Sequence, residues 1–142
     1  MFAFVVKNLA FLKAVPLLPL VFDSLLRLRV FFIKPEILDW LDELEAEAST
    51  WPGMSMAVHK YGGLQFNYRG KEIAHLHSNG LLDSRKTKTK LILEGRIQEH
   101  HVFAKSGWIS FYLRSKDGLD YAKKLLLAAY LKKHQGNLKA EF

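Results

Sequence analysis

The sequence predicts a single α+β domain, in which an antiparallel sheet of about four or five strands is backed by helices. Three observations predict this class. An amphipathic helical pattern over residues 36–48 precedes several short segments with apolar residues at every second position, and a second helical pattern covers 116–133. Strands that are grouped between helices, rather than alternating with them, are typical of α+β folds. The length of 142 residues suits one hydrophobic core and leaves too little chain for a second.

The composition excludes several classes of protein. Apolar residues make up 49% and charged residues 25% of the chain, which predicts a globular rather than a disordered protein. The absence of cysteine excludes disulfides, a thiolate nucleophile and a zinc site built on sulfur. The net charge is +7 although six acids are concentrated in the helix over 36–48, so the rest of the domain is basic and favours anionic partners.

Residues 1–33 form an apolar segment with helical character. Lys7 and Lys13 interrupt it, and the longest uncharged run, 14–22, is shorter than the roughly 20 residues of a membrane span. No small-x-small cleavage site of a signal peptide follows. We expect a membrane anchor that lies on the surface, or a helical pair that packs on the domain or a partner; an ordinary core helix is the alternative. Arg27, Arg29 and Lys34 favour the cytoplasmic side of a membrane.

The α+β domain itself is expected over 34–133, and a frayed polar tail over 134–142. Pro35 begins the first helix, and Thr87 is expected to cap a short helix that ends at Gly95. Gly70-Lys71 is a two-residue connection with glycine first, which predicts a hairpin turn between two strands. The predicted strands are 54–59, 64–69, 72–77, 100–103 and 108–114.

The hairpin has a geometric consequence for two histidines. If Arg69 lies opposite Glu72, then Phe66 faces His75 and Leu64 faces His77. The alternation of side chains along a strand places one set of residues on the same face: Leu64, Phe66, Tyr68, Ile73, His75 and His77. The histidines are therefore expected on the more apolar face. A slip of one residue in register would keep them together and change their neighbours.

Five of the six histidines lie between residues 59 and 101. They are either scattered core and surface histidines or a functional set. As a metal site, His75 and His77 on one strand would need His101 as a third ligand. The glutamate that cupins place shortly after such a pair is missing, and only Asp83 follows. As an acid–base site, a histidine in an apolar cleft has a lowered pKa and can accept a proton from an enol or phenol, with Asp83 orienting the ring.

A basic run over 85–90 raises the question of nucleic acid. Its cations are Arg85, Lys86, Lys88 and Lys90, and two threonines interrupt it. No recognised nucleic-acid motif accompanies the run, so a solvated helix start is favoured and nucleic acid is not an expected partner.

Several ordered blocks resemble the luciferase-like domain family, which contains the fungal luciferases and many bacterial proteins. They are Trp51-Pro-Gly-Met-Ser, His59-Lys-Tyr-Gly-Gly, Glu72-Ile-Ala-His-Leu-His-Ser-Asn-Gly-Leu-Leu-Asp83, Glu94-Gly-Arg, His100-His101 and Ser106-Gly-Trp108. The similarity runs from about residue 36 to 130. Fungal luciferases oxidise a hydroxylated styrylpyrone with molecular oxygen and are not known to need an organic cofactor. Where the family commonly has an apolar, proline-containing stretch after Asp83, residues 84–90 here are polar and basic.

The resemblance implies a protein that binds a small aromatic or apolar molecule in a histidine-lined pocket, with cofactor-independent oxygenation as the candidate reaction. The expected catalytic residues are His75, His77, His101 and Asp83, and the expected pocket residues are Phe66, Tyr68, Trp108 and His100. No organic cofactor is expected, and a metal, if present, would be held by His75, His77 and His101. The alternatives are a non-catalytic, membrane-associated binding module and a metal-dependent enzyme. The sequence does not indicate an oligomeric state.

Overall fold

The computed structural model describes residues 17–85, 98–99 and 107–138, and it confirms the predicted α+β class. Every neighbouring pair of strands is antiparallel. The sheet has six strands in the order β1-β2-β3-β4-β6-β5. The elements are α2 (Leu18–Ile33), α3 (Glu36–Ser49), β1 (Met54–Val58), β2 (Leu64–Tyr68), β3 (Lys71–Leu76), β4 (Leu81–Arg85), β5 (Gln98–Glu99), β6 (Trp108–Tyr112) and α5 (Lys116–Leu138).

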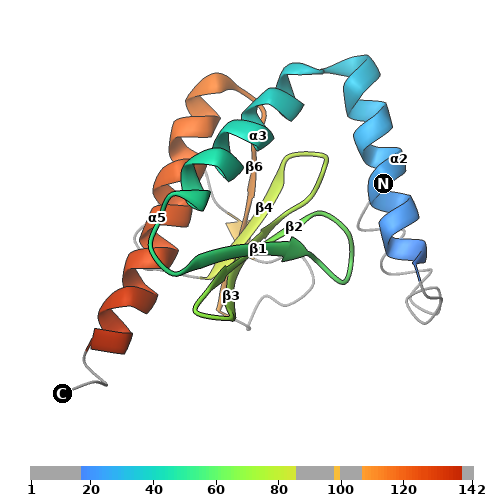
Figure 1. The fold of residues 1–142 in the computed structure, drawn as a ribbon. Coiled ribbons are helices and arrows are strands. Elements are labelled where there is room, and N and C mark those ends of the chain that lie inside the picture. The colour runs from blue at the N-terminus through green and yellow to red at the C-terminus, as the bar shows by residue number, and fades with distance from the viewer. Residues whose placement is uncertain (1–16, 86–97, 100–106, 139–142) are drawn as a thin grey trace.

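Helices α3 and α5 lie together along one face of the sheet (Figure 1). The hydrophobic core fills the space between them and the strands, as the apolar stripe of each helix requires. In α3 the acids Glu36 and Asp39 occupy the first turn, where the helix dipole favours negative charge. The core is formed mainly by Leu44, Ala48, Phe66, Tyr68, Ile73, Ala74, Leu76, Leu82, Ile109, Leu119, Ala122, Leu126 and Ala129.

Helix α2 stands beside the sheet rather than over it (Figure 1). None of its residues is fully buried. It contacts the loop between β1 and β2 so closely that a Cβ at Gly62, whose φ is +87°, would collide with Asp23 and with the Pro19 carbonyl oxygen. Of the helices in the described ranges, none is both long and apolar enough to cross a membrane.

Some predicted boundaries differ from the structure. The last helix continues past residue 133 to Leu138, so the first part of the predicted tail is helical. His134 explains part of this extension, because its ring stacks on Tyr130 and its Nδ1 lies 2.9 Å from the Tyr68 hydroxyl. The strand β4 was not predicted. The helix expected after Thr87 and the strand expected over 100–103 lie outside the described residues.

Candidate functional site

The hairpin between β2 and β3 does not have the predicted register. Its turn residues are Arg69 and Gly70, with φ of 47° and 74°, so Tyr68 rather than Arg69 begins the pairing, opposite Lys71. Two positive φ angles suit the right-handed twist of a two-residue hairpin. A β-bulge then shifts the register next to Phe66, which pairs with Ala74.

This bulge decides which face of the sheet His75 occupies. The turn alone would pair Phe66 with Ile73 and place His75 on the helix-covered face, as predicted. The extra residue in β3 reverses the alternation, so His75 pairs with Gln65 and lies on the opposite face. Phe66 and Tyr68 therefore belong to the core beneath the helices. Their predicted place beside the histidines in a pocket is wrong.

A row of polar side chains crosses this second face of the sheet. Gln65, His75, Asp83 and Ser110 are direct partners on β2, β3, β4 and β6. Asp83 is 0% exposed, Ser110 2% and His75 8%, so three of the four polar side chains are buried, and Gln65 is half-buried. The Ser110 hydroxyl donates a hydrogen bond to Asp83 Oδ1. The sheet thus brings His75 and Asp83 together as the sequence predicted.

His75 lies between two carboxylates. Its Nδ1 is 2.7 Å from Glu72 Oε1, and its Nε2 is 3.3 Å from Asp83 Oδ2. Burial would lower the pKa of His75, but the hydrogen bonds and charges of Asp83 and Glu72 outweigh it and raise the pKa above its ordinary value. The lowered pKa that the sequence predicted for a histidine in an apolar cleft is therefore wrong for His75.

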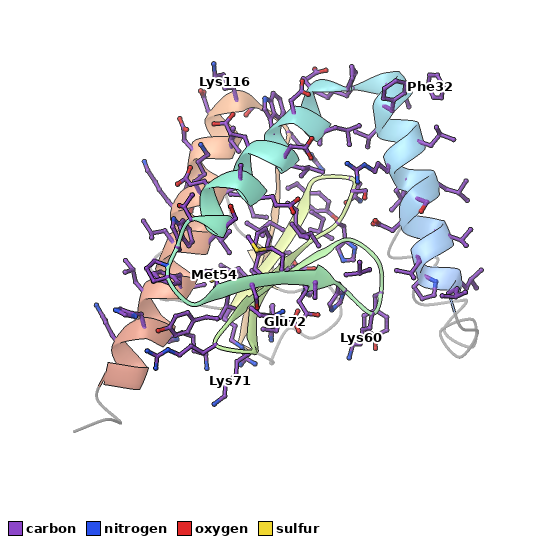
Figure 2. The ribbon with its side chains drawn as sticks, in the orientation of Figure 1. Phe32, Met54, Lys60, Lys71, Glu72 and Lys116 are labelled. Carbon is purple, nitrogen blue, oxygen red and sulfur yellow. The ribbon has the colours of Figure 1, made fainter. Side chains whose placement is uncertain are left out.

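Glu72 was not predicted as a site residue. Figure 2 shows it on the sheet, below β1 and between the labelled Lys71 and Lys60. Burial would raise the pKa of Glu72, but the bond and charge of His75 lower it, so the net direction is downward. Residues three apart on a regular strand point to opposite faces. The bulge is what allows Glu72 to reach His75.

His59 completes the cluster, and it too was not chosen from the sequence. Its ring stacks on that of His75, with centroids 4.1 Å apart and planes 6° from parallel. Its Nε2 lies 3.6 Å from Glu72 Oε1. Burial and the charge of His75 lower the pKa of His59 to about 4. Of the two stacked imidazoles, His59 is therefore the one with the lowered pKa. The sequence feature that could have identified His59 is its position just before the Tyr61-Gly62-Gly63 turn.

Asp23 connects α2 to the site. The backbone N–H and hydroxyl of Ser78 donate hydrogen bonds to it, at 3.2 and 2.6 Å, and His77 Nδ1 lies 3.8 Å from its Oδ1. Burial would raise the pKa of Asp23, but His77 and Ser78 lower it below its ordinary value. Asp23 was missed as a site residue. The sequence feature that could have identified Asp23 is that it is the sole acid among residues 1–34.

Trp108 lies beside the cluster, as predicted. Its ring centroid is 5.4 Å from that of His75, and the Arg85 guanidinium lies over the Trp108 ring, 5.2 Å from the ring centroid. His100 and His101 lie outside the described residues. Among the residues that the structure describes, two trios bring metal-ligand atoms within 4.8 Å of one another: His59, Glu72 and His75, and His75, His77 and Asp83.

The model of one family, described as Luciferase domain, matches residues 70–129. No curated protein and no solved structure matches. The matched segment runs from the turn before β3 into α5 and contains His75, Asp83 and Trp108. The resemblance stated from the sequence is confirmed over this segment. The part of the chain that builds most of the site is therefore similar to the Luciferase domain family.

Proposed function

We propose that the cluster around His75 binds a small aromatic or apolar molecule and oxygenates it without an organic cofactor. One observation carries the proposal: three buried ionisable side chains, His59, His75 and Asp83, gather with the half-buried Glu72 on a face of the sheet that the hydrophobic core does not use. Buried ionisable groups are costly for a fold and cluster at functional sites. The similarity to the Luciferase domain family supports oxygenation as the reaction.

The surroundings of His75 suit an aromatic ligand with an ionisable hydroxyl. The Trp108 ring next to His75 offers a flat apolar wall, against which an aromatic ring can stack. The imidazole of His59 and the carboxylates of Glu72 and Asp83 are groups that can accept a proton from a phenol or enol. Removing that proton makes the ring electron-rich, which is the first requirement for reaction with oxygen.

Oxygen uptake tests this proposal. Purified protein is mixed with a panel of styrylpyrone-like and simpler enolic phenols, and binding is followed in parallel by tryptophan fluorescence. We expect His59→Gln to lower uptake by roughly 10²-fold or more, the usual contribution of a positioned acid–base group. His134→Gln, far from the cluster, should change nothing. Binding without uptake would favour a non-catalytic binding module, and the absence of binding across the panel would contradict both.

We also propose that α2 rests on an anionic membrane surface. Its exposed apolar side chains recur every three or four residues along one side of the helix, opposite the side from which Asp23 reaches Ser78. Arg27 and Arg29 are exposed and flank this stripe, which suits acidic lipid headgroups. Figure 2 shows Phe32 projecting from the end of α2 away from the sheet. The stripe consists of Val21, Leu25, Leu28, Phe31 and Phe32, and the exposed Leu17 lies directly before the helix.

A further inference from the structure

We propose that His75, His77 and Asp83 form a binding site for one divalent transition-metal ion. The inference goes beyond the proposed function and does not depend on it, since it rests on the placement of three side chains. All three residues are buried, and their ligand atoms lie within 4.8 Å of one another. Two imidazoles and one carboxylate would leave further coordination positions open for water or substrate. The third ligand is Asp83, where the sequence suggested His101.

The contact between His75 and Asp83 has the spacing of two metal ligands. Their Nε2 and Oδ2 atoms are 3.3 Å apart. Charge-assisted hydrogen bonds between nitrogen and a carboxylate are shorter, at about 2.7–2.9 Å. Two ligands that each lie about 2.0–2.2 Å from an ion in a tetrahedral arrangement are separated by roughly 3.3–3.6 Å. The other nitrogen of the same ring shows the contrast, because its 2.7 Å contact with Glu72 is an ordinary short hydrogen bond.

A further polar side chain contacts each of the three ligands on the side away from the proposed ion. Glu72 lies against Nδ1 of His75, and Asp23 lies 3.8 Å from Nδ1 of His77. Ser110 donates to Oδ1 of Asp83. Histidines that bind a metal through one nitrogen usually direct the other to a carboxylate, carbonyl or water. In both histidines, then, Nε2 is the atom that would face the ion.

The second trio, His59, Glu72 and His75, is a poorer site. The rings of His59 and His75 are stacked and nearly parallel, 6° apart. The lone pair of an imidazole nitrogen lies in the plane of its ring. The lone pairs of two stacked rings therefore lie in parallel planes and do not converge on one ion. The rings of His75 and His77 are at 88°, with centroids 5.3 Å apart, which lets their lone pairs converge.

The donor set indicates which ions fit. Calcium and magnesium prefer cages of oxygen ligands, which two imidazoles do not provide. Imidazole suits zinc and iron, and two histidines with one carboxylate are the ligand set of non-haem iron oxygenases as well as of zinc sites. The ion is therefore Zn²⁺ or Fe²⁺, and the experiment has an arm for each.

Metal content and affinity test the site without any assay of activity. The full chain is stripped with a chelator, dialysed, and titrated with Zn²⁺, or with Fe²⁺ under anaerobic conditions, and elemental analysis follows. We expect about one equivalent with at least one of the two ions. Asp83→Asn and His77→Gln should weaken binding by 100-fold or more, and Glu72→Gln by about 10–100-fold, as expected for an outer partner of a ligand. His59→Gln and His134→Gln are the matched controls and should retain the full equivalent.

Two outcomes would overturn the site. One is wild-type protein that retains less than about a tenth of an equivalent with both ions, below what any site with a preformed ligand set should hold. The other is loss of binding in His59→Gln with full binding in Asp83→Asn, which would assign the ion to the other trio. If the ligand variants do not fold, X-ray absorption of the loaded wild-type protein decides instead. It should show two imidazole nitrogens and oxygen ligands at the ion, and a shell without imidazole rejects the site.

Discussion

At the scale of single residues, the environment gives two stacked histidines opposite properties. Carboxylates on both ring nitrogens raise the pKa of His75, whereas burial and the neighbouring charge of His75 lower the pKa of His59 to about 4. The sequence predicted that His75, His77 and Asp83 gather, because a strand and an Asn-Gly turn bring them together. It did not predict Glu72, since alternation alone sends that side chain to the wrong face.

The lowered pKa of His59 predicts a pH dependence of stability in the metal-free protein. In the unfolded chain His59 takes up a proton below its ordinary pKa of 6.5, whereas in the folded chain it does so only near pH 4. Protonation therefore favours the unfolded state as the pH falls from 6.5 to about 4. Glutamine at this position does not titrate, so His59→Gln should become more stable relative to wild type as the pH is lowered through this window.

Urea unfolding of both proteins at pH 7.5, 6 and 4.5, with a chelator present, measures this difference in the free energy of unfolding. Comparing the two proteins at each pH cancels the contributions of the shared titrating groups that do not interact with His59. A difference that does not change with pH would mean that His59 titrates as it does in the unfolded chain.

At the scale of elements, β4 shows why part of the sheet was not recognised. Leu81 to Arg85 shows no alternation of apolar and polar residues, although Leu82 faces the core and Asp83 faces the site. Both faces of this strand are buried, and one of them is polar. Prediction from hydropathy expects buried positions to be apolar. It therefore does not detect a strand that lines a polar site.

The glycines before and after β2 are predicted to differ in how well they tolerate alanine. Gly63 and Gly70 both have positive φ, 83° and 74°, which alanine adopts at a cost of about 1–2 kcal/mol. A Cβ at Gly63 would also collide with the Leu76 carbonyl oxygen and press on His77, whereas a Cβ at Gly70 meets nothing within 4 Å. Gly63→Ala should thus be destabilised by about 1–3 kcal/mol more than Gly70→Ala, the usual cost of overpacking.

Thermal and urea unfolding of the two alanine variants measure this difference. Gly70→Ala is the matched control, because it isolates the cost of the backbone conformation. Because the collision at Gly63 involves the backbone next to His77, that variant should also bind metal less tightly. Equal destabilisation of the two variants would show that β2 does not approach the end of β3 as closely as the structure indicates.

At the scale of the whole molecule, the two faces of the sheet bury different kinds of side chain. One face builds an apolar core with α3 and α5, and the other buries a polar cluster to which α2 contributes Asp23. The class of fold and the apolar character of residues 17–33 could be predicted from composition and periodicity. The place of α2 beside the sheet could not, because it depends on contacts between segments that are far apart in the sequence, such as that of Asp23 with Ser78 and the close approach at Gly62.

The exposed stripe of α2 predicts binding to membranes. Leu28 and Phe32 are 53% and 75% exposed and lie one turn apart, so Leu28→Ser with Phe32→Ser removes two apolar side chains without disturbing the core. Each such side chain contributes about 1.5–3 kcal/mol when it leaves water fully. The double variant should therefore bind at least about tenfold more weakly to vesicles that contain phosphatidylserine, even if insertion is only partial.

Co-sedimentation with vesicles measures this binding, with the double variant Leu127→Ser and Leu131→Ser as the matched control. These two leucines are also exposed and one turn apart, but they lie on α5, so their loss should leave binding unchanged. Vesicles of neutral lipid, or high salt, should weaken binding of the wild-type protein, because the contribution of Arg27 and Arg29 is electrostatic and screened by ions. Equal losses in both double variants would mean that general hydrophobicity, and not the stripe on α2, drives the association. Wild-type protein that stays in solution with anionic vesicles would refute the membrane proposal itself, and the site around His75 would then belong to a protein that meets its ligand in water.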